Sequence, residues 1–76
     1  MPLFYFHQRS NGKLAEDGRG RQFGNADQAC EHAVHRTPTL LRKLLRSTSN
    51  TYHSTEVTDG EHSLCVVRVT VIVERR

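Results

Sequence analysis

Ser63-Leu-Cys-Val-Val-Arg-Val-Thr-Val-Ile-Val-Glu74 is the stretch of sequence that decides the fold. Successive side chains of a β-strand point to opposite faces, so this stretch separates into two rows. One row comprises Cys65, Val67, Val69, Val71 and Val73. The second row comprises Leu64, Val66, Arg68, Thr70 and Ile72. We therefore predict one long strand that is largely apolar on both faces, of which a single helix can cover only one.

The length of this strand leads to a predicted self-association surface. The preceding strand, expected from Tyr52 to Thr58, is about half as long, so residues from about Val69 onward are expected to extend beyond it. Unpaired apolar strand edges invite pairing with another chain, which favours a homodimer. The alternative is a monomer whose first strand covers the edge. The residues predicted to associate are Leu64, Val66, Val69, Val71, Ile72 and Val73.

Length and composition limit the function classes. The chain has 76 residues and a net charge of +3, which is mildly basic and permits nucleic-acid binding without requiring it. We expect one domain over residues 1–76, with a small core. No signal peptide is evident, and no apolar run approaches the roughly 20 residues of a membrane span. These features predict a soluble cytoplasmic protein whose two cysteines, Cys30 and Cys65, are free and packed in the core.

Two hairpins are expected, one at each end of the chain. Asn11-Gly12 is typical of a tight hairpin turn, so Leu3–Arg9 and Lys13–Asp17 are predicted to pair. That register places Ser10 opposite Lys13 and His7 opposite Glu16, and it puts Phe4, Phe6 and Ala15 against the core. Asp59-Gly60 indicates the second hairpin, between Tyr52–Thr58 and the final strand.

A helix is expected between the hairpins, with Asn25 as its N-cap and Gln28 as the capping partner. Pro38 removes a backbone donor within it. The apolar spacing continues past the proline, so we predict one kinked helix rather than two separate helices. The residues predicted to face inward are Ala26, Ala29, Cys30, Ala33, Val34, Thr37, Leu40, Leu41, Leu44 and Leu45.

The predicted fold class is α+β, with the order β-β-α-β-β. It is a four-stranded, mainly antiparallel sheet with one proline-kinked helix packed on one face. The loop from Gly18 to Gly24 is expected to connect the first hairpin to the helix, and Phe23 is expected to close the end of the core.

Several short motifs resemble a family of small alphaproteobacterial, rhizobial-type proteins that is grouped as a domain of unknown function. They are the opening Met1-Pro-Leu-Phe-Tyr-Phe-His7 with Arg9 and Asn11-Gly12, then Asp17, Gly20 and Phe23, and finally Val57-Thr-Asp-Gly60. The resemblance spans most of the chain and implies the fold and a bacterial cytoplasmic setting. It implies no activity, cofactor or catalytic residue. The chain differs from the usual pattern in its leucine-rich half-helix after Pro38 and its long valine strand.

The titratable residues do not form a catalytic or metal-binding pattern. Glu31, His32 and His35 share one side of the helix, predicted to face solvent, but a metal site needs further ligands. His7 and Glu16 are expected to form an ordinary cross-strand pair. The glycine-rich loop enters a helix N-terminus, where anions bind, but it lacks the lysine and hydroxyl of a phosphate loop.

We therefore predict a small protein-interaction or regulatory domain, not an enzyme, that self-associates through its final strand. No cofactor, metal site, small-molecule substrate or membrane contact is indicated. The alternative is a weak nucleic-acid-binding protein. Binding would then use the basic end of the helix, and its residues are Arg36, Arg42, Lys43 and Arg46. Steep salt dependence of binding would favour this alternative.

Overall fold

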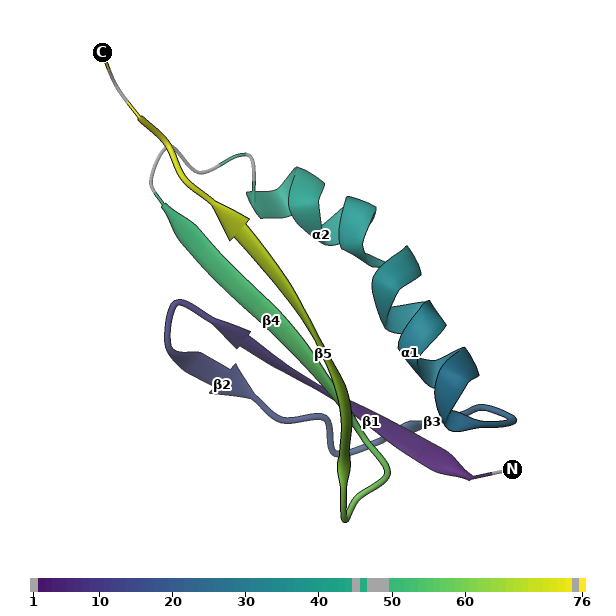
Figure 1. Cartoon of the computed structure of the whole chain (residues 1–76). Helices are drawn as coiled ribbons and strands as arrows, with labels where there is room; N and C mark the ends of the chain where they lie inside the picture. Colours follow the sequence, from purple (N-terminus) through teal and green to yellow (C-terminus); the bar gives the residue numbers. More distant parts are fainter. Residues whose placement is uncertain (1, 45, 47–49, 75) are drawn as a thin grey trace.

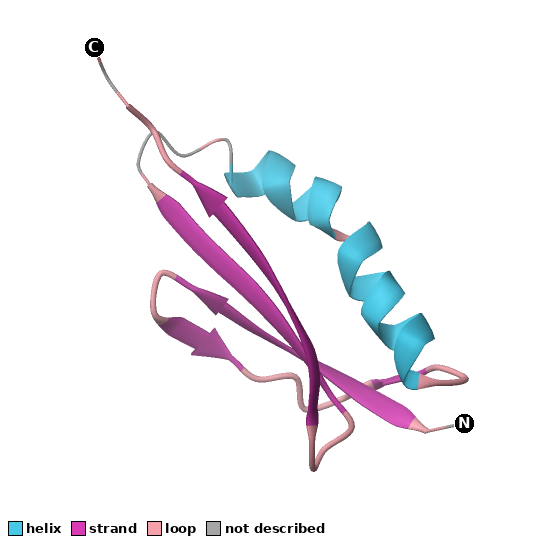
Figure 2. Ribbon diagram, in the orientation of Figure 1, coloured by secondary structure: helices cyan, strands magenta, loops and turns pink. Residues whose placement is uncertain are grey.

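The computed structural model describes residues 2–44, 46, 50–74 and 76, with the side chains of Leu41 and Leu44 excepted. Two helical segments lie along one face of a twisted antiparallel sheet (Figures 1 and 2). The elements are β1 (Leu3–Ser10), β2 (Lys13–Ala15), β3 (Arg21–Gln22), α1 (Ala26–His35), α2 (Thr37–Leu44), β4 (Thr51–Thr58) and β5 (Ser63–Val71). The predicted α+β class is confirmed, with β3 as an additional short strand.

The sheet has the order β2-β1-β4-β5, and β3 pairs with the other end of β1. The Asn11-Gly12 turn has φ values of 49° and 88°, as a tight hairpin requires. The predicted pairing of Ser10 with Lys13 is confirmed. Asn11 also binds the next strand, because its N–H donates to the Tyr52 carbonyl and its Oδ1 accepts from the Tyr52 N–H, each at 2.9 Å.

Asp17 organises the loop between β2 and β3. Its carboxylate accepts hydrogen bonds from the N–H groups of Phe6, Arg19 and Gly20, at 3.1, 3.0 and 3.1 Å. The Asp17 N–H donates to Nδ1 of His7 at 3.0 Å. The predicted pairing of His7 with Glu16 is therefore replaced, because β2 ends at Ala15 and the chain turns so that Asp17 occupies the place beside β1.

The helix begins and breaks where the sequence indicates. Asn25 Oδ1 accepts from the Gln28 N–H, and Gln28 Oε1 accepts from the Gly24 N–H. Arg36 separates α1 from α2, and its own backbone is helical, with φ −80° and ψ −13°. The Thr37 hydroxyl donates to the Ala33 carbonyl at 3.3 Å, next to the turn in which Pro38 lacks a donor. The helix is thus interrupted at one residue without an intervening loop.

The rotation of α1 differs from the prediction at two residues. His32 was expected in solvent, but its ring packs against Phe6 and Phe23, with centroids 5.5 and 5.2 Å apart. Val34 was expected inward and is 55% exposed. The His32 ring packs toward the core because Phe6 and Phe23 lie at this end of the sheet. Val34 lies on the opposite side of α1 and therefore faces solvent. Leu45 lies outside the described residues, as do the side chains of Leu41 and Leu44.

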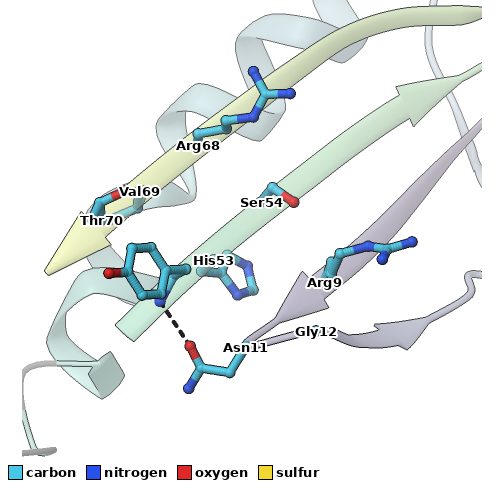
Figure 3. Close-up of a pocket in the computed structure, with 9 residues that line it drawn as sticks. Arg9, Asn11, Gly12, His53, Ser54, Arg68, Val69 and Thr70 are labelled. Carbon is cyan, nitrogen blue, oxygen red and sulfur yellow. Dashed lines mark hydrogen bonds between the residues drawn. The ribbon is translucent and has the colours of Figure 1, made fainter. Parts of the chain in front are cut away.

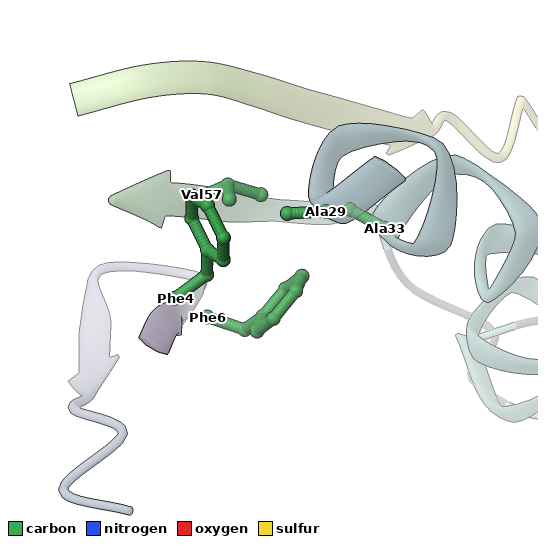
Figure 4. Close-up of a cluster of buried hydrophobic side chains, with 5 residues drawn as sticks. All are labelled: Phe4, Phe6, Ala29, Ala33 and Val57. Carbon is green, nitrogen blue, oxygen red and sulfur yellow. The ribbon is translucent and has the colours of Figure 1, made fainter. Parts of the chain in front are cut away.

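The core is small. The buried apolar side chains in the described part of the chain are Phe4, Phe6, Val57, Ala29 and Ala33 (Figure 4). Phe23 packs edge-on against both Phe4 and Phe6, which confirms its predicted place at the end of the core. Cys30 and Cys65 pack against this cluster as half-buried free thiols, as expected.

β5 pairs with β4 along its whole length, so the predicted overhang beyond Val69 is wrong. Val69 is opposite His53, and Val71 is opposite Thr51. β4 extends to Thr51 and is long enough to cover one edge of β5. The assignment of Leu64 to the uncovered face is also wrong, since Leu64 packs against the core. A β-bulge between Val57 and Thr58 shifts the alternation at this end of the strand.

Candidate functional site

The outer edge of β5 is the longest unpaired strand edge in the described sheet. β5, of nine residues, is the last strand of the sheet order and pairs with β4 alone among the strands that the structure describes. It contains one charged residue, Arg68, and no proline. Natural proteins normally protect such an edge with charges, prolines or short strands. β5 therefore offers a row of backbone donors and acceptors to another strand.

The opposite side of the sheet is protected in this way. β1 is covered there by β2, of three residues, and by β3, of two residues. Between them, the Asp17 carboxylate accepts the Phe6 N–H in place of a strand partner. This contrast singles out β5 as the edge on which another chain can be added.

An apolar hollow of about 510 Å³ runs beside the β5 edge, between β5 and α1. Val34, Cys30, Val66 and Val67 contribute its apolar lining. The outward rotation of Val34 thus adds an exposed apolar side chain next to the open edge.

A second surface is the sheet face that the helices leave uncovered. Arg9, Ser54 and Arg68 form one row across β1, β4 and β5, because Arg9 pairs with Ser54 and Ser54 pairs with Arg68. Figure 3 shows the two arginines on either side of Ser54. Tyr52 and Thr70 form the next row, and with Asn11 they border a hollow of about 180 Å³.

The two arginines on this face carry unneutralised charge. The ion pairs within the described residues are His62–Asp59 and Arg76–Glu74, and neither involves Arg9 or Arg68. The nearest carboxylate along β4 is Glu56, whose Oε2 accepts a hydrogen bond from the Ser63 hydroxyl at 3.0 Å. The row of Arg9, Ser54 and Arg68 therefore carries two positive charges without an ion-pair partner among the described residues.

Both tyrosines of the chain belong to this face. Tyr52 is 54% exposed. Tyr5 stacks on His7 with an interplanar angle of 10° and a centroid distance of 6.4 Å. Gly20, with φ +73°, lies under the Tyr5 ring, where a Cβ would come within 3.0 Å of that ring. The glycine therefore allows the loop to support the tyrosine.

The family model described as a domain of unknown function, DUF6894, matches residues 3–71. The chain belongs to this family. No curated protein and no solved structure matches it. Three of the motif residues of the DUF6894 domain have structural roles. Asp17 organises a loop, Gly20 fits against Tyr5, and Phe23 closes the core.

Several backbone donors of the glycine-rich loop of the DUF6894 domain are already bound within the chain. The N–H groups of Arg19 and Gly20 already bind the Asp17 carboxylate, and the Gly24 N–H binds Gln28. A hollow of about 460 Å³ beside this loop is lined by Arg19, Arg21 and Arg36, and also by Glu16 and Asp17. Its charges are therefore mixed.

The basic residues predicted for nucleic acid lie on α2 or close to its ends. Arg36 lies beside Arg19 and Arg21 in that mixed hollow. Arg42, Lys43 and Arg46 are exposed near the end of α2. The face that carries Arg9 and Arg68 is not predictable from the sequence, because only the strand order brings these residues together.

His32, His53 and the two cysteines of the DUF6894 domain lie in partly or fully buried surroundings. Among the described residues, no group of three or more His, Cys, Asp or Glu side chains is placed to hold a metal ion. Burial lowers the pKa of His32, and Arg21 and Arg36 lower it further. Burial also lowers the pKa of His53, whose Nδ1 lies 2.7 Å from the Ser10 hydroxyl. Within the same residues, no helix is long and apolar enough to cross a membrane.

The Cys65 thiol is expected to be unreactive in the folded protein. Burial, together with the adjacent Cys30 thiol, raises the pKa of Cys65 to about 12. Because the thiolate is the nucleophile, iodoacetamide at pH 8 should alkylate Cys65 on the order of a hundredfold more slowly in the native protein than in urea. Peptide mass spectrometry at timed intervals measures both rates, and equal rates would contradict the packing described here.

Proposed function

We propose that the DUF6894 domain is a small protein-interaction module that pairs with a second copy of itself through the β5 edge. The observation that carries this proposal is the asymmetry between the two sides of the sheet. One side ends in short, interrupted strands, whereas the other ends in the nine-residue β5, whose outer edge pairs with no other strand that the structure describes. Two-fold pairing of identical edges is the simplest closed assembly.

The exposed surface supports an interface of ordinary size. The accessible surface is 5780 Å². Folded monomers of 8.7 kDa expose roughly 4,700 Å² on average. The excess of about 1,000 Å² accords with the elongated shape, of 50 × 21 × 16 Å, and the total surface can provide the roughly 800 Å² that each partner contributes to a standard interface. The small core gives the same indication, because association would enlarge it.

The bounds of β5 select a register for the pair. Full overlap of Ser63–Val71 with its antiparallel copy places Val67 on the two-fold axis and Ser63 opposite Val71. Val66 is then opposite Arg68 of the second copy, and the two Arg68 side chains are not opposite each other. Like charges directly opposite destabilise a sheet, so this register is also electrostatically favourable. The two α1 helices, with Val34, lie on the same face of the joined sheet.

Opposite charges introduced at Val66 are expected to change dimer affinity in opposite directions. Val66→Lys places a lysine opposite Arg68 of the second copy, twice per dimer by symmetry. At about 0.2–1 kcal/mol for each pair, the dissociation constant should rise by roughly 2- to 30-fold. Val66→Glu should lower the dissociation constant by a similar factor. Sedimentation equilibrium over a dilution series measures both.

Glu56 provides an internal control for this experiment. Val66 is opposite Glu56 within the same chain, so Val66→Lys should stabilise the folded chain itself while weakening the dimer. Leu14→Lys and Leu14→Glu are matched variants on the other side of the sheet, and they should leave the dimer unchanged. A monomer mass for the wild-type protein at high micromolar concentration would refute the proposal. Equal effects of Val66→Lys and Val66→Glu would refute the register.

A further inference from the structure

We propose that the uncovered sheet face of the DUF6894 domain binds single-stranded nucleic acid. The binding surface is the patch formed by Arg9, Ser54, Arg68, Tyr52 and Thr70, which borders the hollow in Figure 3. This site is distinct from the basic end of the helix and from the β5 edge. Edge pairing leaves the face open, so the proposal does not depend on dimer formation.

Charge complementarity supports a phosphate-bearing ligand. Arg9 and Arg68 lie on β1 and β5, with β4 between them, so their Cα atoms are roughly 9.6 Å apart, which is two strand spacings. Neither guanidinium has an ion pair within the part of the chain that the structure describes. Guanidinium groups bind phosphate oxygens in a bidentate manner, and the Ser54 hydroxyl lies between them as a further donor.

The aromatic side chains favour a single strand over a duplex. Tyr52 exposes 54% of its surface on the row next to the arginines. Tyr5 and His7 form a stacked pair further along the same face. Unpaired bases stack on such rings, whereas the bases of a duplex are already stacked on one another. On this face, the arginines can bind the phosphates of a single-stranded nucleic acid while the exposed Tyr52 ring stacks on its bases.

The sheet also positions these groups before any ligand arrives. Asn11 Oδ1 accepts the Tyr52 N–H and fixes the start of β4 against the first hairpin. The pairing of β1, β4 and β5 fixes the spacing of the two arginine positions. The affinity of one such face is expected to be modest, because only one exposed ring and two arginines border the hollow.

Fluorescence anisotropy with a labelled twelve-nucleotide oligothymidine at low salt tests the proposal on the full chain. We expect binding in the range of tens of micromolar, with Arg9→Gln and Arg68→Gln each weakening it at least threefold. Each of these variants should also reduce the slope of log affinity against log salt by about 0.7. Tyr52→Ala should weaken binding at least fivefold, and Tyr52→Phe should restore most of the loss.

Arg42→Gln is the matched control, because it removes the same charge from the helix side of the molecule. It should bind as the wild-type protein does. Amide chemical shifts of the wild-type protein should change at Ser54, Arg68 and Thr70 on titration, which locates the site without relying on variants. Equal binding of a blunt duplex or of polyglutamate would overturn the proposal. So would loss of binding in Arg42→Gln, or wild-type affinity in both Arg9→Gln and Arg68→Gln.

Discussion

The Asp17→Ala variant is expected to unfold about 15 °C below the wild-type protein, which corresponds to about 3 kcal/mol. Its carboxylate accepts three backbone N–H groups, those of Phe6, Arg19 and Gly20. The Phe6 N–H lies on the side of β1 between β2 and β3, so the substitution removes the group that takes the place of a strand there. Thermal unfolding followed by circular dichroism measures the change.

The stabilisation by the Asp17 carboxylate is also expected to depend on pH. Partial burial would raise the pKa of the Asp17 carboxyl, but three backbone hydrogen bonds and His7 lower it overall below its usual value of 3.8. The folded chain therefore holds the carboxyl proton less strongly than the unfolded chain. The stabilisation is complete above a pH of about 3.8 and is lost as the pH falls through the folded-state pKa.

The difference between wild-type and Asp17→Ala should accordingly shrink below pH 3.8. Asp59→Ala is the control, because Asp59 also accepts two backbone N–H groups but lies in an exposed turn. It should lower the unfolding temperature less than Asp17→Ala does. A loss in Asp17→Ala no larger than that in Asp59→Ala would contradict the role given to Asp17.

The Phe6→Ala variant is expected to be largely unfolded at 37 °C. Removing a buried phenylalanine costs about 3–5 kcal/mol, which is a large part of the roughly 4–11 kcal/mol available to a domain of this size. The Phe6 ring contacts Phe23 and His32, with centroids 5.8 and 5.5 Å away. Two of the five buried apolar residues in the described part of the chain are alanines, so the phenylalanines supply most of the core described there.

Phe6→Leu separates loss of volume from loss of aromatic contact. It keeps most of the side-chain volume and should cost about 1.5 kcal/mol. Urea denaturation gives both values. If Phe6→Ala lost no more stability than Phe6→Leu, the core would not depend on Phe6 in the way described.

The local features of the fold were predictable from the sequence, because each depends on a few neighbouring residues. Asn11-Gly12 specifies a turn that few other pairs adopt easily, and Asn25 with Gln28 specifies a helix start. The fold class followed from the order of these elements. β3 was missed, because two residues carry no periodic pattern and pair only where the Asp17 loop brings them.

The candidate surfaces were predictable only in part. The apolar final strand predicted an open edge on β5, but the predicted overhang beyond Val69 is wrong because β4 covers β5 to Val71. The orientation of His32 depends on Phe6 and Phe23, which come from distant parts of the chain. The row of Arg9 and Arg68 requires β4 to lie between β1 and β5. The local spacing of apolar residues does not predict the order of the strands in the sheet.

The unequal protection of the two sides of the sheet sets how many chains an assembly can contain. A strand added to β5 reaches a sheet whose far side is short and interrupted by the Asp17 loop. When the added strand belongs to an identical chain, both long edges are consumed at once. In the proposed pair, growth then ends at two chains and does not continue as a fibre.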